Sequence, residues 1–211
     1  MARKLRAGRF LFIAILIIAV AVFAFIKYSE KFSDNDNALA ATVNGYKITK
    51  GYVETRYALL PDTLKATVTY DDFLGQTIDS FLIFQEAEKQ GYSLDDKELD
   101  ERMQKLRDNT GLSEAEFEAQ LLEEGITLED FRQDARRSII VSDFINSKIA
   151  SAVEVSGQEL NDSVSQFDLT GLNISEAEVR LQLEQQLRAQ KTQLAIQTLL
   201  SQLRAKAVIV K

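Results

Sequence analysis

Cysteine, histidine and tryptophan are absent from this sequence of 211 residues. Without cysteine the chain has no disulfide, no thiolate metal site and no thiol nucleophile. Without histidine it lacks the commonest general base and metal ligand, so Ser-His-Asp, Cys-His and zinc chemistry are excluded. The sequence also lacks a glycine-rich phosphate loop, and we expect neither a metal nor another cofactor. Chemistry that uses carboxylates or a Ser-Lys pair remains open.

Proline and glycine are scarce, with one proline (Pro61) and nine glycines. This scarcity favours long helices over a β architecture with many turns. Hydrophobic residues make up 45% of the chain and charged residues 27%, which is typical of a globular domain rather than a disordered one. We therefore predict a mainly α fold.

One long apolar run, from Phe10 to Ile26, stands near the start of the chain. As a helix it would extend about 26 Å, close to the roughly 30 Å hydrocarbon core of a bilayer. Arg9 and Lys27 flank it and could reach the two interfaces. We interpret residues 10–26 as a transmembrane signal anchor, residues 1–9 as a basic cytoplasmic segment and residues 27–40 as a linker.

A cleaved signal peptide is the alternative interpretation of this run. The apolar region of a signal peptide is usually about 7–15 residues, which is shorter than the run found here. Ala38-Leu39-Ala40 has the form of a cleavage motif, but it lies far beyond the apolar run. We therefore favour an uncleaved anchor.

Charge predicts the orientation of the anchor and narrows the range of partners. Arg3, Lys4, Arg6 and Arg9 precede the apolar run with no acidic residue among them, which places the N-terminus in the cytoplasm and residues 27–211 outside it. The rest of the chain has 32 acidic residues against 21 basic ones. Such a surface repels nucleic acid, so we expect none as a partner, and the bilayer is contacted through residues 10–26.

Residues 41–211 are predicted to form one helical domain that opens with a hairpin. Asn44-Gly45 favours a tight turn between short β-prone runs, and Thr49 is suited to cap a helix that ends at Pro61. A broad apolar helix is expected over residues 72–90, with Gly91 as its stop.

Capping signals punctuate the remainder of this domain. Helix starts are expected near Ser93, Ser113, Thr127, Ser156 and Ser175. The helix after Thr127 is expected to continue to Ile149, and the helix after Ser175 is the longest. Residues 207–210 form a short β run that we expect to pair with the hairpin.

Several blocks, taken in this order, resemble a known family. They are Asn44-Gly45-Tyr46-Lys47-Ile48-Thr49, then Phe81-Leu82-Ile83-Phe84-Gln85-Glu86-Ala87-Glu88-Lys89-Gln90-Gly91, Gly111-Leu112-Ser113-Glu114-Ala115-Glu116-Phe117, Glu124-Gly125-Ile126-Thr127-Leu128-Glu129-Asp130-Phe131-Arg132, and Leu203-Arg204-Ala205-Lys206-Ala207-Val208-Ile209-Val210. Together they resemble the N-terminal domain of SurA- and PrsA-type extracytoplasmic foldases. The peptide-binding region of trigger factor is similar in architecture.

The resemblance implies a chaperone module. In those foldases a parvulin prolyl isomerase domain usually precedes the C-terminal helix, but here only residues 153–174 occupy that interval. Parvulin sites also typically use histidines, and this chain has none. The resemblance therefore implies no isomerase, and we predict a membrane-anchored, ATP-independent holdase for newly exported, unfolded polypeptides.

A holdase needs apolar side chains that line an open groove. The candidate client-binding residues are Phe73, Phe84, Met103, Phe117, Leu121, Phe131 and Phe144. Such residues more often belong to a closed core, and the sequence does not separate the two positions. Two other functions remain open: an assembly adaptor for one dedicated membrane partner, and an enzyme, either a prolyl isomerase-related foldase or a carboxylate hydrolase.

Three acidic pairs bear on the hydrolase alternative: Asp71/Asp72, Asp95/Asp96 and Glu123/Glu124. The first two lie where helices are expected to begin, and carboxylates there stabilise the first turn. Adjacent residues on a helix do not face each other, so we interpret the pairs as helix caps and solvated surface rather than as a catalytic dyad.

Overall fold

A computed structural model describes residues 38–165 and 175–211 of the chain. The predicted cytoplasmic segment 1–9, the predicted anchor 10–26 and most of the predicted linker lie outside these residues. Within the described ranges, none of the helices combines the length and the apolar character that a bilayer crossing requires.

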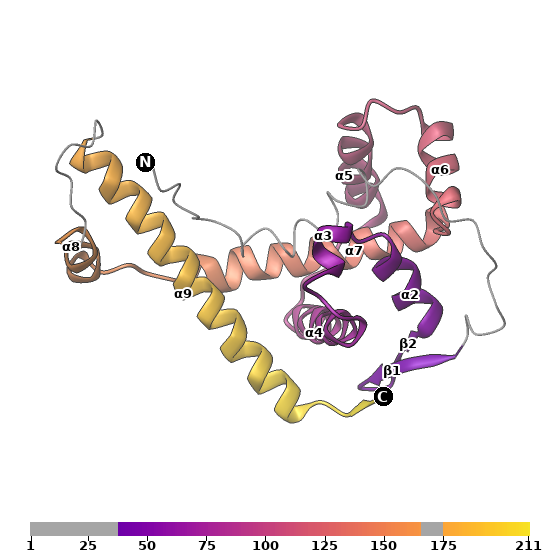
Figure 1. Cartoon of the computed structure of the whole chain (residues 1–211), viewed down its shortest axis with the longest axis horizontal. Coiled ribbons are helices and arrows are strands. Elements are labelled where there is room, and N and C mark those ends of the chain that lie inside the picture. The colour runs from indigo at the N-terminus through magenta and orange to yellow at the C-terminus, as the bar shows by residue number, and fades with distance from the viewer. Residues whose placement is uncertain (1–37, 166–174) are drawn as a thin grey trace.

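The described residues are mainly helical, with a small antiparallel sheet (Figure 1). The strands are β1 (Leu39–Val43), β2 (Tyr46–Thr49) and β3 (Ile209–Val210). The α-helices are α2 (Lys50–Ala58), α3 (Asp62–Lys65), α4 (Tyr70–Lys89), α5 (Asp96–Asp108), α6 (Glu114–Glu123), α7 (Leu128–Phe144), α8 (Gly157–Ser165) and α9 (Glu176–Lys206). A π-helical turn, η1 (Ile145–Ile149), and a 3-10 turn, η2 (Ala150–Ala152), extend α7.

The sheet joins the two ends of the described fold. Its strand order is β2-β1-β3, and both pairings are antiparallel. Asn44 and Gly45 have φ angles of 52° and 85°, the positive values that a tight hairpin turn requires. Val43 pairs with Tyr46 and Thr42 pairs with Val210, so the predicted hairpin and the predicted pairing of the C-terminal strand are both confirmed. β1 begins at Leu39, which places the Ala38-Leu39-Ala40 motif at the start of the sheet.

Helix α4 lies at the centre and contacts β1, α2, α7 and α9 (Figure 1). It begins with a capping box, in which Thr69 and Asp72 each bond to the other's backbone N–H. Gly91, at φ 88°, follows its end. One side of α4 packs on the sheet and α2 in a first hydrophobic cluster that includes Val43, Ile48, Val53, Phe73, Ile78 and Phe81.

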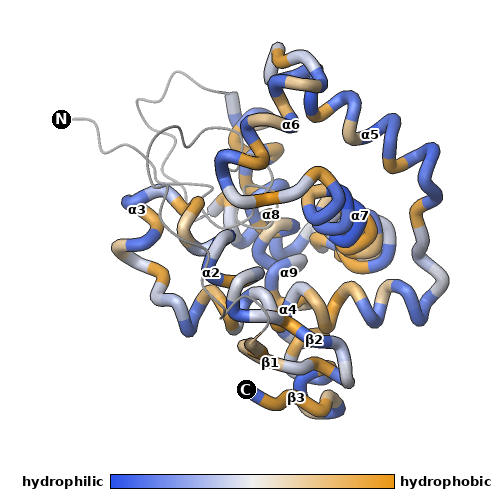
Figure 2. Tube along the Cα trace, turned by 90° about the vertical axis from the view of Figure 1, so that its right-hand side faces the viewer, coloured by the Kyte–Doolittle hydropathy of each residue, from blue (hydrophilic) through white to orange (hydrophobic). Residues whose placement is uncertain are grey.

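A second hydrophobic cluster joins α4 to the helices on its other side. Its buried members include Ala87 of α4, Leu99 of α5, and Ala135, Ile140 and Phe144 of α7. Helix α7, seen almost end-on in Figure 2, is hydrophobic along one side and hydrophilic along the other. This pattern is what a helix needs to pack on the core by one face only.

Helix α9 runs diagonally across the molecule (Figure 1). Its C-terminal part packs on α4, where Nε of Arg204 donates to Oδ1 of Asp79 over 2.5 Å, and it leads directly into β3. Its N-terminal part extends away from α4 and carries α8 beside it. The capping box of Ser175 and Glu178 begins α9, as the sequence predicted.

Three local features differ from the sequence expectations. The N-cap of α5 is Asp95 rather than Ser93, because the Asp95 carboxylate accepts the Glu98 amide. The expected α-helix after Thr127 ends at Phe144, and the π-helical turn occupies the stretch to Ile149. Helix α3 was not expected; Pro61 stands at its N-cap, where a fixed φ and a missing N–H cost nothing.

Candidate functional site

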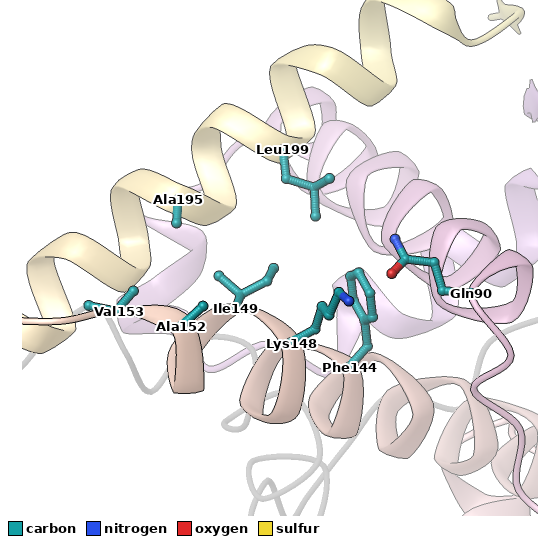
Figure 3. Close-up of a pocket in the computed structure, with 8 residues that line it drawn as sticks. All are labelled: Gln90, Phe144, Lys148, Ile149, Ala152, Val153, Ala195 and Leu199. Atoms are coloured by element: carbon teal, nitrogen blue, oxygen red, sulfur yellow. The ribbon is translucent and has the colours of Figure 1, made fainter.

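An apolar cleft lies between the end of α7 and the middle of α9. Its volume is about 310 Å³, and it is largely open to solvent. Figure 3 shows the two walls: Phe144, Lys148, Ile149, Ala152 and Val153 on the α7 side, and Ala195 and Leu199 on α9, with Gln90 at the end of α4. A cleft of this size is within the range of small-ligand sites and would admit an apolar side chain of a polypeptide.

The segment from α7 to η2 and helix α9 lie nearest each other at the Val153 end and separate toward Phe144 and Leu199, which leaves the cleft between them (Figure 3). Leu199, Leu200 and Leu203 of α9 pack on the second hydrophobic cluster. Further toward the N-terminus of α9, the facing residues are alanines, Ala195 on α9 and Ala152 on η2, and these fill little space. Phe144 forms the buried floor, held by an edge-on contact with Tyr92 at 5.2 Å between ring centroids.

Two polar side chains border the apolar lining. Gln90 donates from Nε2 to Oε1 of Glu86 over 2.7 Å, which leaves its amide oxygen toward the cleft side in Figure 3. Lys148 is exposed, and the described residues include no ion-pair partner for it. The lining therefore offers mainly dispersion and hydrophobic contact, with few groups that would select one particular ligand.

The seven predicted client-binding residues do not converge on this cleft. Phe144 alone among them lines it. Phe73 is buried in the first cluster, and Leu121 is the buried residue of α6. Phe84 and Met103 are half-buried against the second cluster. Their role in client binding stays a prediction, and in this structure Phe73, Leu121 and Phe144 each offer almost no surface.

Phe117 and Phe131 form a separate apolar surface. Their rings meet edge-on at 5.3 Å between centroids and join α6 to α7. Both are half-buried, and Leu122 nearby on α6 is 58% exposed. The pair therefore anchors the α5–α6 projection seen in Figure 1 while keeping part of each ring accessible.

Sequence reasoning missed most of the cleft lining. Ile149 was expected on the apolar stripe of the helix after Thr127, but Ala152, Val153, Ala195 and Leu199 were not singled out. Ala195 and Leu199 are four residues apart and so share one helix face, a spacing that could have drawn attention to them. Alanine carries little hydrophobic signal, and a cleft arises where small residues face each other across two helices.

A polar network between α2 and α7 was also missed. Oδ2 of Asp134 accepts from Nε of Arg56 at 2.6 Å, and Oδ1 accepts from the Tyr52 hydroxyl at 3.1 Å. Arg137 donates to the same hydroxyl and lies 4.0 Å from the centroid of the Phe81 ring. Burial raises the pKa of Tyr52, so its hydroxyl stays neutral. All four polar groups satisfy one another, which is typical of a structural network.

The first two acidic pairs lie at helix starts, as expected from the sequence, whereas Glu124 of the third pair is partly buried instead of fully solvated. Hydrogen bonds from Thr69 hold the pKa of Asp72 below its ordinary value, as expected for a capping carboxylate. Arg136 and Arg132 lower the pKa of Asp96 in the same direction and tie α5 to α7. Partial burial raises the pKa of Glu124, whose side chain accepts from Gln120. Among the described residues, no group of carboxylates has the arrangement of a metal site.

Comparison with known families now connects this geometry to a protein class. The model of the SurA-like N-terminal domain matches residues 1–145, which is more than half of the chain. This chain belongs to the SurA-like N-terminal domain family. The resemblance inferred from the sequence blocks is thereby confirmed.

Several curated proteins named "Chaperone SurA" are similar to this SurA-like chain. The protein of Chromobacterium violaceum is 35% identical over 91 residues, which is 43% of this chain and 21% of that relative. The protein of Hahella chejuensis is 26% identical over 132 residues, or 59% of this chain and 30% of that relative. That of Pseudomonas putida is 30% identical over 95 residues. The SurA-like chain thus matches less than a third of the length of these relatives.

The family match and the cleft overlap only in part. The matched region ends at Ile145, so it includes Gln90 and Phe144 but not Lys148, Ile149, η2 or α9. The family match therefore includes only Gln90 and Phe144 of the cleft lining, and the other lining residues follow it in the chain.

Proposed function

We propose that this protein is an ATP-independent chaperone that binds unfolded polypeptides, using the cleft between α7 and α9 to hold their apolar side chains. The single observation that carries the proposal is membership of the SurA-like N-terminal domain family, whose curated relatives are named chaperones. The apolar, open lining of the cleft supports it, because such a surface can take many side chains without demanding one sequence.

The proposal can be tested with an aggregation assay. The full chain, kept in a mild detergent, should suppress light scattering by a chemically unfolded client protein in a concentration-dependent way and without ATP. Ala195→Glu would place a long charged side chain in the cleft while keeping a good helix former, so suppression should fall several-fold. Leu194→Glu, at the neighbouring exposed position, is the matched control and should leave suppression unchanged.

Three outcomes would count against the holdase. Absence of suppression at several-fold molar excess would exclude it. Recovery of one stoichiometric membrane partner without binding to unfolded clients would favour an assembly adaptor instead. Accelerated isomerisation of a proline-containing peptide would show an enzymatic activity that the proposal does not include.

We further propose that residues 10–26 anchor the chaperone in the cytoplasmic membrane, with residues 27–211 on its outer side. The apolar run and the basic residues before it support this placement. An anchor of this kind would raise the local concentration of the cleft near polypeptides that leave the export pore. Protease added outside bacterial spheroplasts should digest the domain, and alkaline carbonate should fail to extract the protein. Protection from the protease would reverse the assigned orientation.

A further inference from the structure

One end of the α7-side wall of the cleft is formed by a short segment that we call the strap. We use this name for residues 150–156, which lead from the π-helical turn through η2 to the start of α8. Ala152 and Val153 of the strap line the cleft opposite Ala195 and Leu199 of α9 (Figure 3). The width of the cleft at this end therefore depends on how closely the strap lies against α9.

The backbone hydrogen bonds of the strap lie in its first half. The Ala150 amide donates to carbonyls of the π-helical turn, and the Val153 amide donates to the Ala150 carbonyl over 3.2 Å, where the backbone of Val153 is extended. The carbonyl groups of Val153 and Glu154 accept hydrogen bonds from side chains of α9. Nη1 of Arg188 donates to the Val153 carbonyl at 2.9 Å, and Nζ of Lys191 donates to the Glu154 carbonyl at 2.8 Å. Residues three apart share one helix face, so α9 grips the strap with adjacent side chains.

Lys191 also fastens the element that follows the strap. Its ammonium lies 2.6 Å from Oε1 of Glu159, and the same carboxylate caps α8 through the amide and hydroxyl of Ser156. Arg188, Lys191 and Glu159 are each between a third and a half exposed. Exposed charged contacts of this kind are individually weak and are screened by salt, so they can hold the strap without fixing it permanently.

The other end of the strap adjoins an irregular stretch of helix. Ser147 donates to the Asp143 carbonyl, and Ser151 donates to the Ser147 carbonyl, each over 2.5 Å. Serine hydroxyls that bond to carbonyls four residues earlier tend to loosen and bend a helix. Together with the π-helical turn, they give the chain a place to flex just before the strap.

We propose that the strap is a movable wall of the cleft, which Arg188 and Lys191 hold against α9 and whose release widens the cleft for a longer segment of polypeptide. This inference rests on the proposed chaperone function, because it concerns the regulation of the same cleft. With the strap held in place, the cleft accommodates a single side chain. Release of the strap would widen the cleft at its Val153 end.

The movement itself can be measured without any client. Because the chain has no cysteine, thiols introduced by Glu154→Cys on the strap and Lys89→Cys on α4 can be spin-labelled selectively. In the full chain in mild detergent, Arg188→Met with Lys191→Met should broaden the label distance and lengthen its mean. Arg180→Met removes an exposed α9 arginine that binds α8 but not the strap, and should change nothing. A label pair at Lys89 and Gln197 should stay fixed in every variant.

The functional consequence is tested with a fluorescent, reduced and carboxymethylated α-lactalbumin as the unfolded probe. The association rate should rise at least threefold in the Arg188→Met, Lys191→Met variant and stay unchanged in Arg180→Met. For the unmutated chain, raising NaCl from about 0.05 M to about 0.5 M should act in the same direction, because salt screens the contacts of Arg188 and Lys191 with the strap and Glu159, which we call the latch. The salt series needs no mutation and so stands even if a variant folds poorly.

The outcomes separate this inference from the proposed function. If the probe binds but the label distance and the association rate are the same with and without the latch, the strap is a fixed wall and the inference is overturned. If the distance changes but no variant binds the probe, the strap moves and the chaperone function fails. A slower association after the latch is removed would show that the strap helps to bind the client, and would also overturn the inference.

Discussion

Asn44 and Val208, which are 164 residues apart in the sequence, are joined by two hydrogen bonds. The Asn44 amide donates to the Val208 carbonyl at 2.9 Å, and the Val208 amide donates back to Oδ1 of Asn44 at 2.9 Å. Nδ2 of the same asparagine donates to Oε1 of Gln85 on α4. One turn residue thus joins the hairpin, the C-terminal strand and the central helix.

Replacing this asparagine should weaken the junction in two separable ways. Asn44→Ala loses both side-chain bonds and also puts alanine, which tolerates the left-handed region less well than asparagine, at φ 52°, so we expect the free energy of unfolding to fall by about 1–2 kcal/mol. Asn44→Gly loses the same bonds but tolerates the positive φ, and should be less destabilised than the alanine variant. Urea unfolding of both variants measures the difference; equal losses would show that the φ angle contributes nothing.

Replacing two glycines, one inside α4 and one just after its end, by alanine should change the free energy of unfolding in opposite directions. Gly75 lies inside α4 with no atom near the position of a new Cβ, so Gly75→Ala should stabilise the fold by about 0.5–1 kcal/mol. Gly91 follows the same helix at φ 88°, so Gly91→Ala should destabilise it by about 1 kcal/mol. Thermal unfolding monitored by circular dichroism gives both signs. A gain at Gly91 would contradict the left-handed conformation there.

Removing the charge of Asp134 should destabilise the contact between α2 and α7. Asp134→Asn would leave Arg56 and Arg137 partly buried without their carboxylate, and we expect a loss of about 1.5–3 kcal/mol in the free energy of unfolding. Glu129→Gln on the same helix is the control, because its exposed side chain accepts a hydrogen bond from Gln133 and forms no ion pair among the described residues, and it should change stability by less than about 0.5 kcal/mol. Comparable losses in the two variants would show that the network is not a structural contact.

The acid titration of Glu159 should depend on Lys191. Hydrogen bonds from Lys191 and Ser156 lower the pKa of Glu159 from 4.5 to about 2. Because the folded pKa is below the unfolded one, the stabilisation is present above pH 4.5 and is lost as the pH falls through about 2. Carboxyl NMR titration should therefore show the pKa of Glu159 rising toward 4.5 in Lys191→Met.

Glu178 provides the reference for this titration. It caps α9 through Ser175 in the way that Glu159 caps α8 through Ser156, and those hydrogen bonds lower its pKa. Among the described residues it has no lysine partner. Its midpoint should therefore be the same with and without Lys191→Met, and a shift of both carboxyls would indicate a general change of the fold instead of a lost contact.

Local signals in the sequence predicted much of this fold. The Asn44-Gly45 turn and the capping serine and threonine residues at 113, 127 and 175 stand where the structure has a hairpin and helix starts. Each of these features depends on hydrogen bonds within a few residues, so the sequence contains the whole signal. The π-helical turn after Phe144 escaped prediction because the apolar spacing there is also compatible with an α-helix.

The candidate site could be predicted only as a class of side chains. Residues such as Phe73 and Phe144 were selected because they are apolar and lie on the apolar faces of expected helices, but whether each is covered depends on helices far away in the chain. The ion pair of Arg56 and Asp134 joins residues 78 apart and has no counterpart in any local pattern. Membership of the family was predictable, because it depends on the order of several short blocks rather than on one contact.

The pairing of β3 with β1 has a consequence for the order of assembly. Strand β1 is made early, but one of its two neighbours is separated from it by almost the whole described chain. Contacts between such distant segments form slowly, because a long loop must close before they are gained. The domain can therefore complete its sheet only after residues 209–210 have been synthesised. A protein proposed to protect emerging chains would itself remain incompletely folded until its own last strand arrives.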